Sequence, residues 1–167
     1  ASLIVGDEAA KDRRLQAAAV RLAAAWKLSE LAGTLRDLAI SEKTTPTLQQ
    51  AALDGLVAIG GPASKQTIQA VIQSSKSMPS RIFAAAALAR LDSTAGAAAA
   101  ADLLTQVKSS DDVGPLLEAL LSRKDGADRL AAALKTKTPP ADAAKMALRY
   151  IYSIGRSDQE LSDVLSK

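Results

Sequence analysis

The chain has 167 residues, with 21 Lys and Arg against 18 Asp and Glu, and a formal net charge of +3. It contains neither Cys nor His, which excludes disulfides, thiolate nucleophiles, imidazole bases and ordinary zinc sites. Apolar residues make up 48% of the chain and aromatic residues only 2%, so Ala and Leu supply most of the packing surface. Ala and Leu head the helix propensity scale, which predicts an all-α protein. We expect no cofactor, and no apolar run approaches the length of a membrane span.

Residues 1–43 contain a weak helical pattern that we interpret as a degenerate N-terminal capping unit. Its apolar positions are Leu22, Ala25 and Leu28, followed by Leu35, Leu38 and Ala39. Trp26 is the one Trp of the chain, and in a cap its bulk would cover the end of a helical stack. An exposed Trp would instead be a candidate for a binding hot spot.

From Pro46 onward, two sets of apolar residues recur together along the chain. The first set is Leu53, Leu56, Ile59; Ala85, Leu88, Leu91; Leu117 and Leu120 with Arg123 at the third position; and Leu148, Ile151, Ile154. The second set is Ile68, Val71, Ile72; Ala100, Leu103, Leu104; Leu130, Ala133, Leu134; and Leu161, Val164, Leu165. Each set returns after about 30 to 32 residues. The first set is spaced i, i+3, i+6 and the second i, i+3, i+4, as on one helical face.

Turn residues separate these two sets in the same way in every unit. Pro46, Pro79, Pro115 and Pro139 lie near the start of each first helix, where the missing N–H costs little. Gly, Asp and Ser then separate the first helix from the second, at 60–62, 92–94, 124–126 and 155–158. Each unit is therefore predicted to be a pair of helices.

A helix pair of about 31 residues cannot bury its apolar face alone, so neighbouring pairs must stack. The sequence predicts a single all-α domain, a right-handed α-solenoid of about five helix pairs and about ten helices. Residues 46–167 would form four regular repeats behind the capping unit 1–43. A compact helical bundle is the alternative fold.

The ends of the predicted first helices resemble those of HEAT repeats. The resemblance rests on the residues 56–63 (LVAIGGPA), 87–92 (ALARLD) and 152–155 (YSIG) and covers the chain from about Pro46 onward. It implies a HEAT-like solenoid. The unit of Leu117 departs from the pattern, because Arg123 and Lys124 stand where an apolar residue and Gly are expected.

The Ala-rich residues 82–91 (IFAAAALARL) also resemble helical segments of large exported proteins of planctomycete-type bacteria. Those proteins join a propeller-like dehydrogenase domain to a C-terminal c-type cytochrome. This resemblance implies a connecting module, an accessory to a redox enzyme, in the periplasm or outside the cell. Without it we expect a cytoplasmic protein. The chain contains no haem attachment motif, so no redox residue is carried over.

Two patterns suggest chemistry, and each has a simpler structural explanation. Gly60-Gly61-Pro62 is similar to a phosphate loop, but it follows a predicted helix and Pro62 removes a donor N–H. The acidic clusters are Asp7 and Glu8; Asp111 and Asp112; and Asp158, Glu160 and Asp163. Each flanks a predicted helix start, where negative charge is favourable. We therefore expect the chain itself to be no enzyme.

We interpret the chain as a protein-interaction or spacer module, a segment of a larger polypeptide. Its partner would be another protein or a neighbouring domain, and we expect a monomer. The positions opposite the second apolar set are the candidate binding residues: Gln66, Gln69, Gln73, Asp102, Thr105, Asp128 and Lys135. The alternatives are a nucleic-acid-binding HEAT-like domain, which the dispersed basic residues and four aromatic residues disfavour, and the redox accessory domain.

Overall fold

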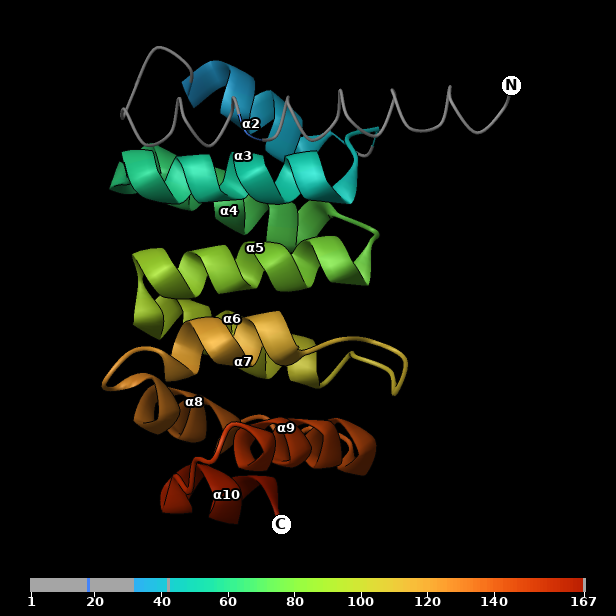
Figure 1. The fold of residues 1–167 in the computed structure, drawn as a ribbon, viewed down its shortest axis with the longest axis vertical. Helices are drawn as coiled ribbons and strands as arrows, with labels where there is room; N and C mark the ends of the chain where they lie inside the picture. Colours follow the sequence, from blue (N-terminus) through green and yellow to red (C-terminus); the bar gives the residue numbers. More distant parts are fainter. Residues whose placement is uncertain (1–17, 19–31, 42, 167) are drawn as a thin grey trace. The chain divides into compact units, whose positions relative to one another are not determined.

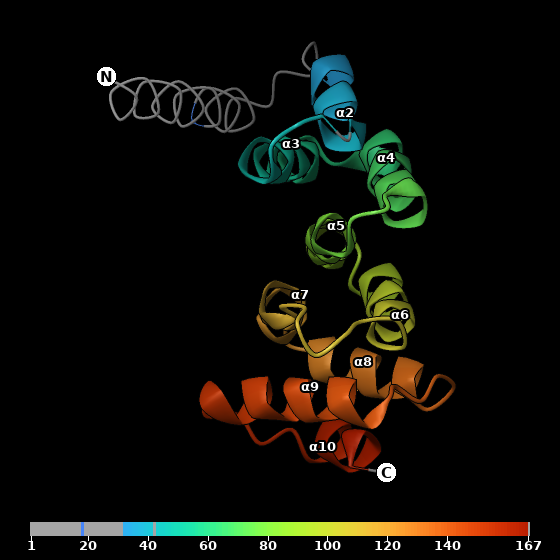
Figure 2. The ribbon, with the colours of Figure 1, turned by 90° about the vertical axis from the view of Figure 1, so that its right-hand side faces the viewer.

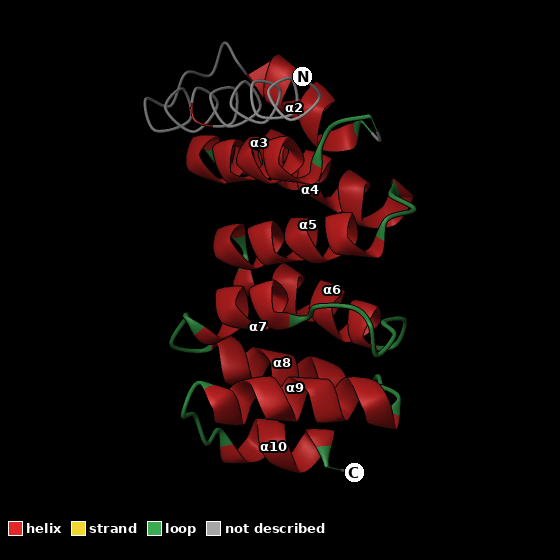
Figure 3. Cartoon of the chain, turned by 45° about the vertical axis from the view of Figure 1, so that its right-hand side comes forward, coloured by secondary structure: helices red, strands yellow, loops and turns green. Residues whose placement is uncertain are grey.

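The computed structural model describes residues 18, 32–41 and 43–166, and this part of the chain is helical, with nine helices and no strand (Figure 3). The all-α prediction is confirmed for these residues. The apolar positions 22, 25 and 28 of the predicted cap, and Trp26, lie outside them. The helices are α2 (Ala32–Ile40), α3 (Pro46–Ile59), α4 (Gly61–Ser74), α5 (Met78–Leu91), α6 (Ser93–Leu104), α7 (Gly114–Leu121), α8 (Gly126–Leu134), α9 (Ala141–Ser153) and α10 (Gln159–Leu165).

The chain divides into two compact units, Ala1–Val71 and Ile72–Lys167, with the boundary inside α4. In the first unit, α2 packs against α3. Gln49 lies buried at this contact, and its Nε2 donates to the carbonyl oxygen of Ala39 at 2.8 Å. The apolar core of this unit consists of Leu35, Ala39, Ala51, Ala52, Leu53, Leu56, Ile68 and Val71.

The second unit contains three helix pairs arranged in two rows. In one row α5 packs against α7 and α7 against α9; in the other, α6 packs against α8 and α8 against α10. Figure 1 shows α5, α7 and α9 following one another, and Figure 2 shows α6 beside α7. One continuous apolar core runs through this unit from Ile82 to Leu165. Successive helix pairs therefore share their buried surface.

Proline and small polar residues set the helix boundaries at the predicted places. Pro46 is the first residue of α3 and Pro79 the second of α5. Asp92 ends α5 and begins α6, where its carboxylate accepts a hydrogen bond from the backbone N–H of Ala95 at 3.0 Å. Between α3 and α4, Gly60 has φ +74°, which favours glycine.

The two apolar sets form the core, but the third member of each first-set triad turns away from it. Leu88 and Leu120 are buried, whereas Leu91 is half-buried and Arg123 is exposed. At about 100° per residue, a step of six residues shifts a side chain by about 120° around the helix. Arg123 and Ile154 also lie beyond the ends of α7 and α9, and Ile154 is 45% exposed.

Candidate functional site

The three candidate glutamines lie along α4. Gln66 and Gln73 are exposed and Gln69 is half-buried. The opposite side of this helix buries Ser64, Ile68 and other core residues. The spacing of three and four residues thus places the glutamines on the outer face of α4, as predicted, and their role in binding stays a prediction.

Asp102, near the end of α6, links this helix to the segment after α8, and Thr105 directly follows α6. The carboxylate of Asp102 forms an ion pair with Lys137, which lies in the segment after α8. The hydroxyl of Thr105 donates to the backbone oxygen of Asp102 at 2.7 Å. Asp102 is half-buried, whereas Thr105 is exposed and accessible to a partner.

Lys135, which directly follows α8, forms a similar ion pair with the next second helix, α10. Its Nζ lies 2.5 Å from Oε1 of Glu160 in α10. Both side chains are more than half exposed, so the pair contributes at most about 1 kcal/mol to stability. Lys135 and Asp102 therefore each connect successive second helices and are not isolated charges.

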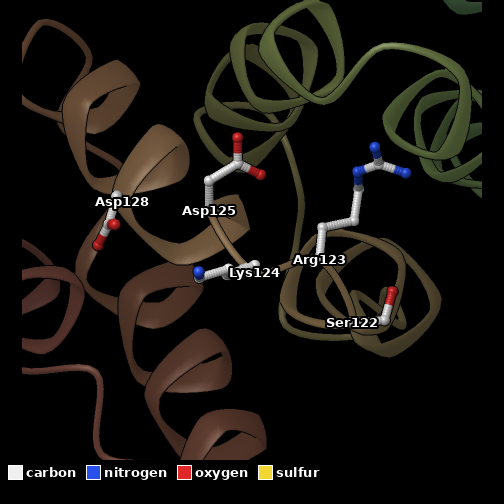
Figure 4. Close-up of a pocket in the computed structure, with 5 residues that line it drawn as sticks. All are labelled: Ser122, Arg123, Lys124, Asp125 and Asp128. Atoms are coloured by element: carbon white, nitrogen blue, oxygen red, sulfur yellow. The ribbon is translucent and has the colours of Figure 1, made fainter.

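Asp128 lines a shallow depression of about 520 Å³ at the turn between α7 and α8. The other lining residues are Ser122, Arg123, Lys124 and Asp125, and their side chains fan out from the turn rather than converging on one point (Figure 4). Two basic and two acidic side chains leave it without a net charge. None of the five is buried, so the depression lacks the desolvation that an acid or base catalyst requires.

One of these carboxylates, that of Asp125, forms an ion pair with Arg129. Nε of Arg129 donates to Oδ2 of Asp125 at 2.5 Å, and this hydrogen bond holds the pKa of Asp125 below its usual value of 3.8. The Nη1 of Arg129 donates to the hydroxyl of Thr94 at the start of α6. In the described residues, no cluster of three or more acidic, His or Cys side chains is placed to hold a metal ion.

Two arginines that the sequence analysis did not assign to a function link successive first helices. Nη1 of Arg123 donates to the backbone oxygen of Arg90, at the end of α5, at 3.3 Å. Nη1 of Arg156 donates likewise to the backbone oxygen of Leu121, at the end of α7. Cationic groups are favourable beside the terminal carbonyls of a helix. The signal in the sequence was an Arg recurring after 33 residues, from 123 to 156.

The second of these contacts is reinforced by an ion pair. The guanidinium of Arg156 donates through Nε and Nη2 to the two carboxylate oxygens of Asp158 at 2.8 and 2.9 Å. This hydrogen bonding lowers the pKa of Asp158 below 3.8 and raises that of Arg156. The planar guanidinium therefore has a fixed orientation when it reaches Leu121.

The two tyrosines of α9 have opposite environments, as their two-residue spacing predicts. Tyr152 is 59% exposed, whereas Tyr150 packs partly buried against the core. Burial raises the pKa of Tyr150 above 10.0, and the carboxylates of Glu118 and Asp112 raise it further.

No family model, curated protein or solved structure matches the chain. The resemblances to HEAT repeats and to the planctomycete-type proteins accordingly stay predictions. Among the described helices, none combines the length and the apolar character needed to cross a bilayer.

Proposed function

We propose that the chain is a non-catalytic protein-interaction or scaffold module built as a right-handed, HEAT-like α-solenoid. The packing of the second unit supports this proposal, because its first helices pack against one another in succession and its second helices do the same. In such a stack each pair contacts mainly its neighbours, and one row offers a continuous lateral surface. The same twin apolar pattern extends back to α3 and α4, which would continue the repeat.

The observation that carries the proposal is the outer face of α6 and α8. Its exposed residues are small or polar: Thr94, Ala98 and Thr105 on or beside α6, and Asp128, Ala132 and Lys135 on or beside α8. The links from Lys137 to Asp102 and from Arg129 to Thr94 hold the two helices in register. A preorganised surface of this kind loses little conformational entropy on binding.

The charge on this face favours a protein partner over nucleic acid. Arg129 of α8 and the following Lys135 and Lys137 are each paired with a carboxylate, whereas Asp128 of α8 has no ion pair among the residues that the structure describes. A phosphate backbone requires a stripe of available cations. A protein surface with Lys or Arg at its rim suits this face better.

The test compares two matched charge variants of the 167-residue chain. Asp128→Arg with Ala132→Arg alters the outer face of α8, whereas Glu118→Arg with Ser122→Arg alters exposed positions of the same spacing on and beside α7. Immobilised wild type and variants are compared for the proteins they retain from an extract of the source cells, followed by titration of a retained protein in solution. We expect the α8 variant to bind at least about tenfold more weakly.

The α7 variant should bind this protein like the wild type. Equal binding by both variants would show that the face of α6 and α8 is not the interaction surface. Loss of binding in the α7 variant alone would assign the interaction to the first row instead.

A further inference from the structure

The connection between α6 and α7, residues 105–113, is the longest between two described helices. In Figure 1 and Figure 3 it extends beyond the ends of both helices. Val107 and Val113 anchor it, because their side chains are 8% and 4% exposed and belong to the core of the second unit. The tip between these anchors, residues 108–112, is polar throughout, and all of it except the half-buried Asp111 is exposed. The tip therefore buries no apolar side chain.

Two hydrogen bonds close this tip into a turn. Oδ2 of Asp111 accepts a hydrogen bond from the backbone N–H of Lys108 at 2.7 Å, and the N–H of Asp111 donates to the backbone oxygen of Lys108 at 3.0 Å. Both bonds lie at the surface, where water can replace them. A segment held in this way opens locally without the unfolding of the helices beside it.

The position of Lys108 in the connection distinguishes it from other exposed lysines. An endoprotease binds the residues on both sides of the bond in extended form, so a helix end close to the bond must first unwind. Helix α7 begins six residues after Lys108. By contrast, α3 begins three residues after Lys43, and α5 and α8 begin two residues after Lys76 and Lys124. Cleavage after Lys108 therefore costs the least local unfolding of these four.

The other lysines of the described residues are held more firmly. Lys65 lies within α4 and Lys145 within α9. Lys135 and Lys137 each form an ion pair with a carboxylate. Lys108 forms no ion pair in the part of the chain that the structure describes, so its side chain is available to a protease.

We propose that the connection between α6 and α7 is a site of limited proteolysis, at which an endoprotease with an acidic pocket for lysine hydrolyses the bond between Lys108 and Ser109. Exposed polar loop tips are the preferred sites of such cleavage. An acidic specificity pocket binds a basic side chain on the carbonyl side of the bond. Water supplies a hydroxyl to the carbonyl carbon of Lys108 and a proton to the nitrogen of Ser109. The acid so formed ionises, and its proton is taken up by the new amino group.

The two pieces, 1–108 and 109–167, stay together as one folded molecule. Contacts of α6 with α8 and of α5 with α7 join one piece to the other. The ion pair between Lys137 and Asp102 also crosses the cut. The apolar core of the second unit is built from both pieces, and hydrolysis at the tip exposes none of it. The inference goes beyond the proposed lateral interaction, because the cut bond lies outside the outer faces of α6 and α8.

Limited digestion of the folded 167-residue chain with a lysine-specific endoprotease tests the site. Mass spectrometry identifies the cuts that arise within residues 32–166, and we expect the first of them to follow Lys108. Size-exclusion chromatography without denaturant should then show the piece ending at Lys108 and the piece 109–167 in one peak, at the position of the intact chain. Denaturant should separate the two pieces.

A matched pair of variants tests whether this bond dominates the cleavage. Lys108→Gln should lower the total rate of cleavage within residues 32–166 at least about tenfold, because every remaining site needs a larger local opening. Lys124→Gln should leave that rate unchanged, since Lys124 is also an exposed lysine between two helices of the second unit. Circular dichroism is used to check that each variant retains its helix content.

Substitution of Asp111 tests the role of the turn. Asp111→Ala should accelerate cleavage after Lys108 at least about threefold, because it removes the acceptor of the Lys108 N–H and raises the population of the open tip. Asp111→Asn removes the same charge but keeps a side-chain oxygen that can accept this bond, so its cleavage should be accelerated less. Equal rates for the two variants would overturn the role given to this hydrogen bond.

A first cut elsewhere within residues 32–166 would overturn the proposal, as would equal rates for Lys108→Gln and Lys124→Gln. Pieces that separate without denaturant would overturn it as well, because they would show that the fold depends on the intact connection. None of these results bears on the lateral face, whose variants are assayed separately.

Discussion

Two glycines in the second unit lie where a side chain would collide with backbone atoms. A Cβ on Gly96 in α6 would lie 2.3 Å from Cα of Ala89 in α5, and one on Gly126 would lie 1.8 Å from the carbonyl oxygen of Leu120. These glycines let the second helix of a pair approach the first closely. Neither glycine has a positive φ, so their role is space and not backbone conformation.

Gly96→Ala should therefore destabilise the protein by about 1–3 kcal/mol, the usual cost of overpacking a rigid contact. The control is Gly33→Ala in α2, where no atom lies within 4 Å of the added Cβ. At that helical position Ala should be neutral or stabilising, by up to about 1 kcal/mol. Urea unfolding of both variants measures the difference. Equal stability of the two variants would show that α6 does not pack closely against the backbone of Ala89 at Gly96.

Arg156 and Asp158 contribute a stability term that depends on pH. The pKa of Asp158 is lowered in the folded chain, so the unfolded chain takes up a proton more readily. The stabilisation is complete above the unfolded value of about 3.8 and is lost as the pH falls through the folded pKa. Asp158→Asn should cost about 1–2 kcal/mol at pH 7, as expected for a hydrogen bond between charged groups.

The measurement is the free energy of unfolding of wild type and Asp158→Asn between pH 7 and about pH 2. The difference between them should shrink as the pH falls below about 4. Arg156→Lys has one donor nitrogen in place of the planar fork whose three nitrogens reach both carboxylate oxygens and Leu121, so it should lose part of the same stabilisation at neutral pH. A difference independent of pH would mean that the carboxylate of Asp158 is not the group responsible.

At the scale of elements, the sequence predicted the helices well because their boundaries depend on local chemistry. Proline in the first turn of a helix and Asp or Gly at a helix end affect only the backbone of the nearest few residues. Asp92, for example, is both the C-cap of α5 and the N-cap of α6. Contacts between helix pairs were not predictable in this way. That Arg123 reaches Arg90, 33 residues earlier, depends on the packing distance between α5 and α7.

Packing also determines which leucines contribute most to the free energy of unfolding. Leu88 in α5 is 2% exposed and lies between Ala residues that cannot expand into a cavity. Leu88→Ala should cost about 2–5 kcal/mol, the usual range for a buried leucine. Leu161→Ala in α10 should cost less, because α10 packs against α8 and α9 at one end of the second unit.

Chemical denaturation gives the two costs, and hydrogen exchange locates the loosened segments. Leu161→Ala should loosen mainly α9 and α10, and Leu88→Ala should also loosen α6 and α7, which pack against α5. The comparison is made at concentrations where the mass is that of one chain. Equal costs with global loosening in both variants would favour the compact bundle over the solenoid.

For the whole molecule, helical spacing predicted that the candidate residues lie at the surface, but not which residues they contact. The spacing of Asp102, Thr105, Asp128 and Lys135 placed them on outer helical surfaces, where the structure finds them. It did not predict that Lys137 and Glu160 pair with two of these residues, because those contacts join segments 25 to 35 residues apart. Helical geometry fixes which way a side chain points, whereas its neighbours depend on how helix pairs stack.

These ion pairs limit how much of the net charge of +3 is available to bind an anionic partner. In the second unit Arg129, Lys135, Lys137 and Arg156 each form an ion pair with a carboxylate, so they offer little free charge to phosphates. Tyr152 is the exposed aromatic side chain of this unit, and one aromatic does not form a platform for stacked bases.

We therefore expect weak binding of nucleic acid without sequence preference, with a dissociation constant of about 10⁻⁴ M or higher at physiological salt. Fluorescence anisotropy with labelled duplexes of unrelated sequence, and with a single strand, gives the affinities at two or more salt concentrations. Few phosphate contacts should give a shallow dependence on salt, because each neutralised phosphate adds about 0.9 to the slope for a duplex. Submicromolar binding with a slope of about 5 or more would reverse the ranking of protein over nucleic acid as the partner. In that case the cations without a carboxylate partner, such as Lys145 and Arg149 on α9, would be the first positions to neutralise.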